Sequence, residues 1–115
     1  MTVNELVEKL ELEVFSGKNG LEDETSGGYT SDLMSDVVGH SEKGNVWITL
    51  PADKNVMAIA SLRELAAVIL VKGFSPDKDT LEKSNEENIP ILGTSLETFE
   101  ITGRVFEALK YEIPW

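Results

Sequence analysis

The sequence predicts a single α/β domain, with a mainly parallel sheet and helices packed on both faces of that sheet. Strand-like and helix-like patterns alternate through the second half of the chain with short connections, as parallel strands joined by helical crossovers require. The chain has 115 residues, which is enough for one core. Neither an internal repeat nor a linker interrupts it, so we expect residues 1–115 to form one domain.

The first segments predict a helix followed by a strand. The segment from Thr2 to Glu5 has the spacing of a capping box, and apolar residues follow it at helical spacing. Apolar residues then alternate with glutamates over residues 10–14, as in a strand with one solvated face. Residues 16–30 are polar and rich in glycine, which predicts a long loop, with a tight bend at Gly27-Gly28.

The middle of the chain predicts one helix and two strands. Ser31 to Gly39 has an apolar helical face and is expected to form a short helix. Val46 to Leu50 is rich in β-branched residues and predicts a strand. Val56 to Ala60 is a continuous apolar run, which is typical of a strand buried on both faces.

Three further helix starts are predicted in the second half, each after a strand. Ser61 to Glu64 is a second capping box and predicts a short helix before a strand at residues 68–71. Ser75, as the N-cap, starts a helix that ends at Asn88. A strand at residues 89–92 leads to a third capping box, Thr94 to Glu97, and to a last helix ending near Leu109.

Composition excludes several classes of function. The chain has 10 basic and 21 acidic residues, a formal net charge of −11, which opposes binding to nucleic acid or to an anionic membrane surface. It has no cysteine, which excludes disulfides, thiol nucleophiles and thiolate ligands to a metal. The sequence has neither a signal-peptide pattern at its start nor an apolar stretch long enough to span a bilayer, so we expect a cytoplasmic location.

The predicted topology indicates a candidate ligand site. In an open parallel sheet, ligands bind beyond the carboxyl ends of the strands. Three expected strand-to-helix turns lie on that edge, and a hydroxyl N-cap with free N–H groups in each would favour an anion such as a nucleotide phosphate. The candidate ligand-binding residues are Ser61, Lys72, Gly73, Ser75, Thr94 and Ser95. The alternative is that the capping residues only cap their own helices.

Two other motifs carry weaker functional interpretations. Gly17 to Gly20 resembles a phosphate loop only superficially, because Asn19 follows Lys18 where the motif needs Ser or Thr. Asp32, Asp36 and His40 lie four residues apart, a spacing that would let a helix hold a divalent metal for a small enzyme. The simpler interpretation is helix-end electrostatics. We therefore expect neither a bound metal nor catalytic residues.

The last predicted helix is apolar on two aspects. Leu96, Phe99, Phe106 and Leu109 form one, with Gly103 allowing close approach, and Ile101, Val105 and Ala108 form the second. A helix of this kind covers a sheet and also presents a surface to a partner. We expect an oligomer interface here, to which Trp47 and Trp115 contribute; the alternative is a wide core face.

Nearly the whole chain, Asn4 to Phe106, resembles the DRTGG domain. The resemblance is carried by GGYTSDLMSDVVGH (27–40), NVMAIASLRELAAVILVKG (55–73) and IPILGTSLETFE (89–100). The family's TGG signature falls on Val71-Lys72-Gly73. This domain occurs beside CBS domains in regulated pyrophosphatases and as small stand-alone proteins, and it is similar to the N-terminal domain of HPr kinase/phosphorylase.

The resemblance implies a regulatory or assembly module, often dimeric, with no catalysis and no cofactor of its own. In kinase-like relatives phosphoryl transfer belongs to a separate P-loop domain. We therefore expect a homodimer that binds an adenine nucleotide or another anion at the strand carboxyl edge. The alternative is a protein-interaction subunit with no small ligand, since similar stand-alone members accompany iron-hydrogenase and redox gene clusters.

Overall fold

The computed structural model describes residues 1–51, 54–110 and 112. A five-stranded sheet in the order β1-β5-β4-β3-β2 forms its centre. The strands are β1 (Glu13–Ser16), β2 (Gly27–Thr30), β3 (Asn45–Thr49), β4 (Ala67–Leu70) and β5 (Ile91–Gly93). Neighbouring strands from β2 to β5 are parallel, and β1 runs antiparallel to β5. The predicted fold class is therefore confirmed.

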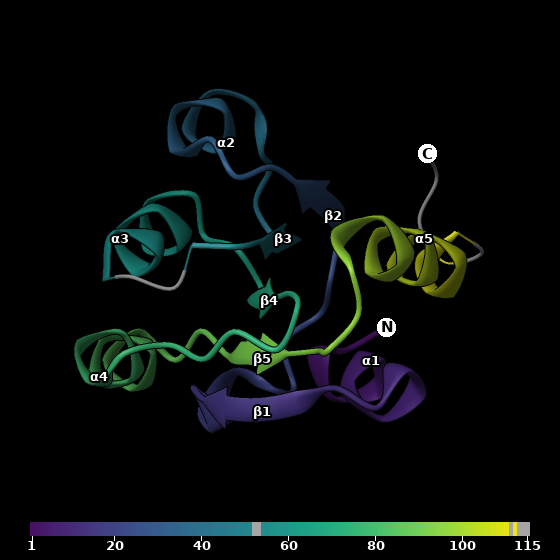
Figure 1. Ribbon diagram of the computed structural model, residues 1–115, viewed down its shortest axis with the longest axis horizontal. Helices are drawn as coiled ribbons and strands as arrows, with labels where there is room; N and C mark the ends of the chain where they lie inside the picture. The colour runs from purple at the N-terminus through teal and green to yellow at the C-terminus, as the bar shows by residue number, and fades with distance from the viewer. Residues whose placement is uncertain (52–53, 111, 113–115) are drawn as a thin grey trace.

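Helices cover both faces of this sheet. The helices are α1 (Val3–Leu10), α2 (Met34–His40), α3 (Lys54–Leu62), α4 (Lys78–Glu87), α5 (Thr98–Leu109) and a short 3₁₀ helix, η1 (Lys18–Gly20). Figure 1 shows α2, α3 and α4 on one side of the sheet and α1 and α5 on the other. Each side has its own apolar cluster, and every residue of β3 and β4 is buried. Within the described residues, no helix is both long and apolar enough to cross a bilayer.

The start of the chain folds largely as predicted. Thr2 and Glu5 form the capping box of α1, with the Glu5 N–H donating to Thr2 Oγ1 at 3.1 Å. The helix continues to Leu10 and ends with Glu11 in the left-handed region, at φ 54°. Because the helix uses Leu10, the strand begins at Glu13, three residues later than its alternating pattern indicated.

The predicted strand over Val56 to Ala60 is wrong, because this run is the core of helix α3. Val56, Met57 and Ala60 are buried while Ala58 is exposed, which is a helical and not a two-residue period. Ser61 therefore lies in the last turn of α3, and the predicted capping box at residues 61–64 and the helix after it do not exist. Strand β4 follows at Ala67, as expected for this segment.

The predicted bend at Gly27-Gly28 is also wrong. These glycines begin β2, which lies at one edge of the sheet and pairs only with β3, from Gly27 opposite Asn45 to Thr30 opposite Ile48. Backbone pairing needs no side chain, and α5 packs over this strand, with Val105 Cγ1 3.6 Å from where a β-carbon of Gly28 would lie. The glycine-rich composition therefore concealed a strand.

Three helix starts differ from their predictions by a few residues. Helix α2 begins at Met34 and not at Ser31. The N-cap of α4 is Asp77 and not Ser75, with Asp77 Oδ1 accepting from the Thr80 N–H at 2.8 Å. Helix α5 starts after Glu97, which makes no side-chain cap, so the predicted capping box is wrong. Thr94 Oγ1 instead accepts from the Leu96 N–H at 3.2 Å, closing a turn before the helix. The predicted left-handed end of α4 at Asn88 is confirmed.

Trp47 has no part in a molecular surface, contrary to the prediction. Its side chain is fully buried in β3, and its Nε1–H donates to the Ser31 carbonyl at 2.8 Å. Burying its large apolar ring stabilises the fold, and the hydrogen bond satisfies its one polar group, so Trp47 belongs to the core. Trp115 lies outside the described residues.

Candidate ligand pocket at the carboxyl edge of the sheet

A cavity of about 300 Å³ lies where β4 and β5 end. Because β1 is antiparallel to β5, the beginning of β1 reaches this same edge, with Glu13 opposite Gly93. The parallel strands therefore contribute their following loops, and β1 contributes its first residues. The cavity is lined by Glu11, Glu13, Phe15, Gly73, Phe74, Ser75, Gly93, Thr94 and Ser95.

The structure brings together most of the predicted site residues. Gly73, Ser75, Thr94 and Ser95 line the cavity, and Lys72 immediately precedes Gly73. Ser61 does not join them. It lies near the end of α3, before β4 begins, and therefore at the opposite edge of the sheet, where its hydroxyl donates to Glu87 Oε2 at 3.0 Å.

Backbone hydrogen bonds join the two loops of this edge. The Lys72 N–H donates to the Leu96 carbonyl and the Gly73 N–H to the Thr94 carbonyl, both at 2.9 Å. Lys72 and Gly73 have positive φ angles of 59° and 75°, which turn the chain sharply after β4. Lys72 and Gly73 were predicted as ligand-binding residues, but their backbone N–H groups are already used within the protein. The side chain of Lys72 lies at 3.6 Å from Glu97.

Aromatic side chains form two walls of the cavity. The register between β1 and β5 shifts between Val14 and Ser16, so Phe15 is the extra residue of a β-bulge. Bulges redirect side chains at sheet edges, and here Phe15 packs with the apolar cluster on the α3 side of the sheet. Phe74 is 48% exposed, so its ring is accessible to a ligand.

The charge of the cavity wall limits what it can bind. The carboxylates of Glu11 and Glu13 lie at one side and would repel a phosphate placed beside them. Carboxylates accept hydrogen bonds from hydroxyl and amino groups. The cavity therefore suits the uncharged, hydrogen-bond-donating part of a molecule, with a flat apolar part against Phe74. Any anionic part fits better on the side of Lys72.

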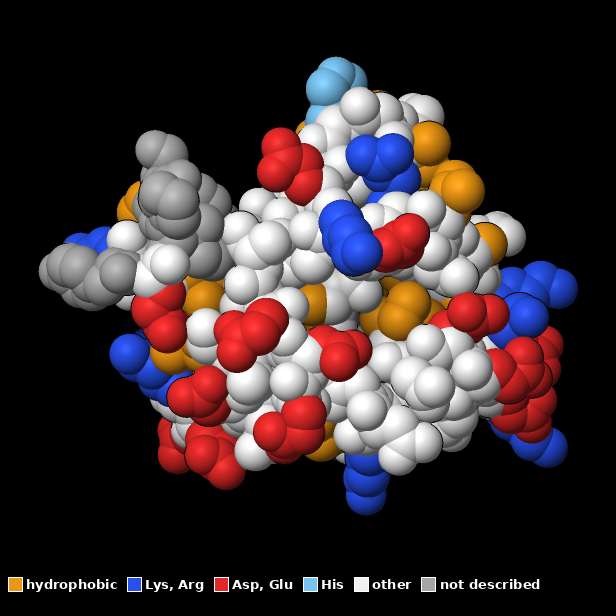
Figure 2. All heavy atoms as spheres, turned by 180° about the vertical axis from the view of Figure 1, so that it is seen from behind, with side chains coloured by type: hydrophobic (Ala, Val, Ile, Leu, Met, Phe, Trp, Pro, Cys, Tyr) orange, Lys and Arg blue, Asp and Glu red, His pale blue; other side chains and the backbone are white. Residues whose placement is uncertain are grey.

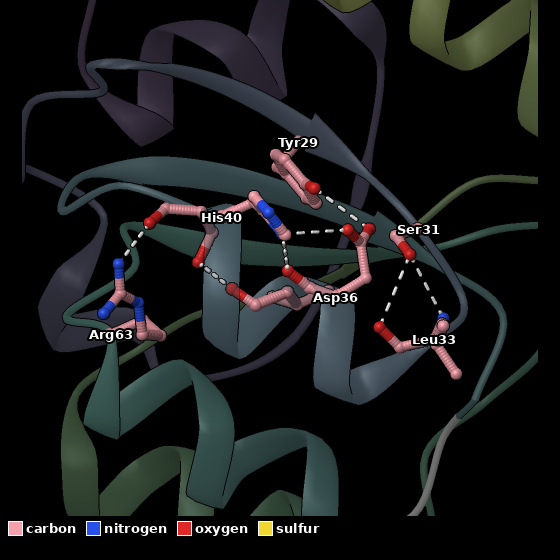
Figure 3. Close-up of polar contacts among 8 residues, drawn as sticks. Tyr29, Ser31, Leu33, Asp36, His40 and Arg63 are labelled. Carbon is pink, nitrogen blue, oxygen red and sulfur yellow. Dashed lines mark hydrogen bonds and ion pairs between the residues drawn. The ribbon is translucent and has the colours of Figure 1, made fainter.

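A separate polar cluster on α2 contains Asp36 and His40, two of the three residues whose spacing would suit a metal (Figure 3). Tyr29 donates from its hydroxyl to Asp36 Oδ2 at 2.9 Å, and His40 Nδ1 lies 3.2 Å from Asp36 Oδ1. Hydrogen bonding by Ser31, and then by Tyr29, holds the pKa of Asp36 below its usual value. Burial, together with the hydrogen bond to Asp36, raises the pKa of Tyr29.

Asp32 does not lie with Asp36 and His40. Its Oδ1 accepts from the Leu50 N–H at 2.9 Å and from the Thr49 hydroxyl at 3.2 Å, so it closes the end of β3. In residues 1–51, 54–110 and 112, no three carboxylate or imidazole groups are arranged to hold a metal ion. The three residues therefore do not share one helical face as their spacing would allow, because α2 begins at Met34 and Asp32 lies before it.

Helix α5 presents an apolar surface on the far side of the sheet from α3. Ile101, Val105 and Leu109 are buried, whereas Phe99 is 92% exposed and Phe106 51% exposed. A groove of about 880 Å³ runs along the exposed face of α5 beside Lys9 and Leu10 of α1. The second aspect of the helix is thus core, and the aspect with Phe99 and Phe106 is surface. Leu109 and Leu96 were assigned to the wrong aspect, because Leu109 is buried and Leu96 precedes the helix and packs against the core.

Sequence reasoning missed Glu11, Glu13, Phe15 and Phe74 as residues of the cavity. Glu13 and Phe15 belong to β1, and Glu11 lies at the end of α1 just before it. The antiparallel direction of β1 has no signal in its own sequence. Phe74 follows Gly73 in a predicted loop at the carboxyl edge of the sheet. An aromatic residue at that place in the sequence was the one available signal for an apolar wall of the cavity.

The fold and the edge cavity define a small α/β domain whose cavity is built from the loops after β4 and β5. The model of the DRTGG domain matches residues 5–108, and the chain belongs to this family. No curated protein sequence matches the chain.

Among solved structures, the chain is similar to the regulatory region of Clostridium perfringens pyrophosphatase, which comprises CBS and DRTGG domains and was crystallised with its activator, diadenosine tetraphosphate. The TM-score is 0.68, with 14% sequence identity over 90% of this chain. The chain spans 45% of that structure, and the likeness at this identity establishes the fold.

Proposed function

We propose that this chain is a non-catalytic regulatory and assembly module. It binds an adenine nucleotide, or a related anionic ligand, in the carboxyl-edge cavity and forms a homodimer through α5. Membership of the DRTGG family supports the regulatory role, and the similar fold in a regulatory region crystallised with an adenine dinucleotide supports the class of ligand.

The observation that carries the proposal is the direct connection between the cavity and α5. Gly93, Thr94 and Ser95 line the cavity, and α5 begins at Thr98, three residues later. The Leu96 carbonyl in this connection accepts from the Lys72 N–H at 2.9 Å. A ligand that orders these loops therefore acts on the first turn of the helix that carries the exposed surface.

The charges favour one orientation of a nucleotide. Its ribose hydroxyls and base amine donate to Glu11 and Glu13, and its base lies against Phe74. Its phosphates extend toward Lys72, whose ammonium exchanges Glu97 for the ligand. This orientation keeps the phosphates away from the carboxylates of Glu11 and Glu13.

The exposed face of α5 has the composition of a two-fold interface. Phe99 and Phe106 provide an apolar centre, and the rim of the groove includes two basic and two acidic residues, Lys9, Arg104, Glu100 and Glu107. An isologous interface brings the same patch together twice, so a rim with both signs can pair with its own copy. This balance is unusual for a chain with a net charge of −11.

Isothermal titration calorimetry with AMP, ADP and ATP tests the ligand. We expect saturable binding that Lys72→Glu weakens by about fivefold or more, because the phosphates lose an attractive charge and gain a repulsive one. The matched control is Lys78→Glu, which makes the same charge change at an exposed lysine outside the cavity. The absence of heat at millimolar nucleotide, or equal weakening in both variants, would contradict the proposal.

A second candidate function is docking: the exposed face of α5 binds a different protein instead of a second copy of this chain. The exposure of Phe99 supports it as well as it supports a homodimer. Light scattering coupled to size exclusion separates the two: a dimer that Phe99→Glu dissociates supports the homodimer. The control variant Leu62→Glu alters a side chain 68% exposed on α3 and should leave the mass unchanged. A monomer at every concentration would favour the docking subunit.

A further inference from the structure

A second cavity, of about 420 Å³, lies at the other end of β1. We propose that it is a binding site for a small organic oxyanion, a carboxylate or a phosphate monoester. It is lined by Phe15, Ser16, Gly17, Lys18, Asn19, Asn85 and Asn88. The proposal does not depend on the nucleotide site or on the dimer, because its polar groups lie at the opposite edge of the sheet; of the lining residues, only Phe15 also lines the carboxyl-edge cavity.

The loop from Gly17 to Gly20 is held tightly against the end of α4. A β-carbon on Gly17 would lie 2.5 Å from the Ile89 carbonyl oxygen, and one on Gly20 would lie 2.1 Å from that of Asn88. Only glycine allows these approaches, and Gly17 also has a φ of 73°. Beneath the loop, the buried Ser16 hydroxyl donates to Ser84 Oγ at 2.8 Å. The backbone of this loop is therefore held in place before any ligand binds, and the exposed side chains of Lys18, Asn19, Asn85 and Asn88 surround it.

The side chains around the cavity offer hydrogen-bond donors. The Gly17 N–H donates to Asn85 Oδ1 at 2.8 Å, which identifies the oxygen of this amide and leaves its Nδ2 as a donor. Asn88 Oδ1 accepts from Asn19 Nδ2 at 3.4 Å, which likewise leaves the Nδ2 of Asn88. Within the described residues, neither Nδ2 group nor Lys18 Nζ has a partner in the protein.

The electrostatic setting distinguishes this cavity from the others. Much of the surface is acidic, as the many Asp and Glu side chains on the face in Figure 2 show. The carboxyl-edge cavity has two glutamates and no basic residue in its wall, and in the groove along α5 two glutamates are balanced by Lys9 and Arg104. The cavity at Lys18 has one lysine, three amides and no carboxylate in its wall. An anion is therefore attracted there and repelled by most of the remaining surface.

The size and the aromatic wall define the class of ligand further. A bare inorganic anion would fill little of about 420 Å³. Phe15 is half-buried in this wall and offers a flat apolar contact. An oxyanion with a planar body fits both features: the anionic group takes Lys18 and the amides, and the body lies against Phe15. This site is not a phosphate loop, because its hydrogen-bond donors are side chains and not the backbone N–H groups of a helix N-terminus.

NMR of the ¹⁵N-labelled chain tests the proposal through the amide of Lys18 and the side-chain NH₂ group of Asn85. The probes are phenyl phosphate and benzoate, with benzamide as the neutral analogue of benzoate. We expect saturable shifts at both groups with at least one anion, and no comparable shifts with benzamide. The anion that binds more tightly identifies which oxyanion the site prefers. Shifts equal with benzamide, or absent with both anions, would overturn the proposal.

Two variants separate the site from non-specific attraction. Lys18→Gln should weaken binding by about three- to fivefold, as for an exposed ion pair, whereas Lys78→Gln, with the same charge change elsewhere, should not. Asn85→Asp keeps the acceptor for the Gly17 N–H but replaces the Nδ2 donor with a negative oxygen, so it should abolish binding while the fold persists. Unchanged affinity in Asn85→Asp, with a native spectrum, would refute the site.

Discussion

The ring of Phe15 lies against Gly93, so that a β-carbon on Gly93 would come within 2.4 Å of Phe15 Cε2. Phe15 is the bulged residue of β1, and Gly93 is the last residue of β5. The same ring lines the carboxyl-edge cavity and the cavity at Lys18. One aromatic side chain therefore forms a shared wall between the two candidate ligand sites, and the absence of a side chain at residue 93 makes its position possible.

Gly93→Ala should move the Phe15 ring and alter both cavities. The contacted atoms are the far end of a half-buried side chain, which can shift, so we expect a loss of about 1 kcal/mol in the free energy of unfolding. Denaturant unfolding followed by tryptophan fluorescence measures it. The double variant Phe15→Leu with Gly93→Ala should lose less free energy of unfolding than the two single variants lose together, because the smaller side chain at residue 15 no longer clashes with the added β-carbon. Strict additivity would contradict the contact.

Gly20→Ala should cost more than Gly93→Ala. Its β-carbon would lie 2.1 Å from the Asn88 carbonyl oxygen, and backbone cannot rotate away as a ring can. We expect a loss of about 3 kcal/mol, at the upper end for overpacking. The matched control is Gly39→Ala in α2, where the added carbon meets no atom within 4 Å. That helical substitution should stabilise by roughly 0.5–1 kcal/mol. A smaller loss at Gly20 than at Gly93 would contradict the packing described for η1.

Helix α3 predicts a clear contrast between neighbouring residues. Met57 is 1% exposed, so Met57→Ala should cost about 2–5 kcal/mol in the free energy of unfolding. Ala58 is exposed on the same helix, so Ala58→Glu should change stability by less than about 0.5 kcal/mol. Thermal unfolding by circular dichroism measures both. Severe destabilisation by both changes would favour the strand buried on two faces that the sequence had indicated.

Stability should fall on the acid side through carboxyl groups with lowered pKa values. Hydrogen bonds from Thr80 lower the pKa of Asp77, and bonding by Ser31 and Tyr29 lowers that of Asp36. A carboxyl whose pKa is lower in the folded state stabilises above its unfolded pKa, near 4, and this contribution is lost as pH falls through the folded value.

Denaturant unfolding between about pH 2 and pH 7 measures this loss. Asp36→Asn keeps an acceptor for Tyr29 but cannot titrate, so its stability should depend less steeply on pH below about 4. Glu86→Asn serves as a control, because Glu86 is an exposed residue on α4 outside these networks. An acid slope in Asp36→Asn as steep as in the unchanged chain would contradict the role of Asp36.

The parts of the fold that follow from local chemistry were predictable. The capping box of Thr2 and Glu5 and the left-handed end of α4 at Asn88 involve neighbouring residues, and both are confirmed. The run Val56 to Ala60 was misread because five apolar residues fit either period, and only burial by tertiary packing distinguishes them. The spacing of Val56, Met57 and Ala60 was the one local signal for a helix.

The candidate site was predictable to the extent that it follows from parallel topology. Gly73, Ser75, Thr94 and Ser95 meet because β4 and β5 are parallel neighbours. Ser61 was misplaced because the error over α3 assigned it to the wrong edge of the sheet. Glu11 and Glu13 reach the cavity only because β1 pairs antiparallel with β5, a long-range pairing that no local pattern encodes.

The most direct test of the regulatory proposal is an NMR titration of the ¹⁵N-labelled chain with AMP and ATP, following every backbone amide. We predict saturable shifts at Gly73, Thr94 and Ser95 that continue into the first turn of α5, which links the cavity to the exposed surface. Shifts confined to Gly17, Lys18 and Asn19 would contradict nucleotide binding at the carboxyl edge while supporting the separate oxyanion site. No shift at millimolar nucleotide would contradict the nucleotide proposal altogether.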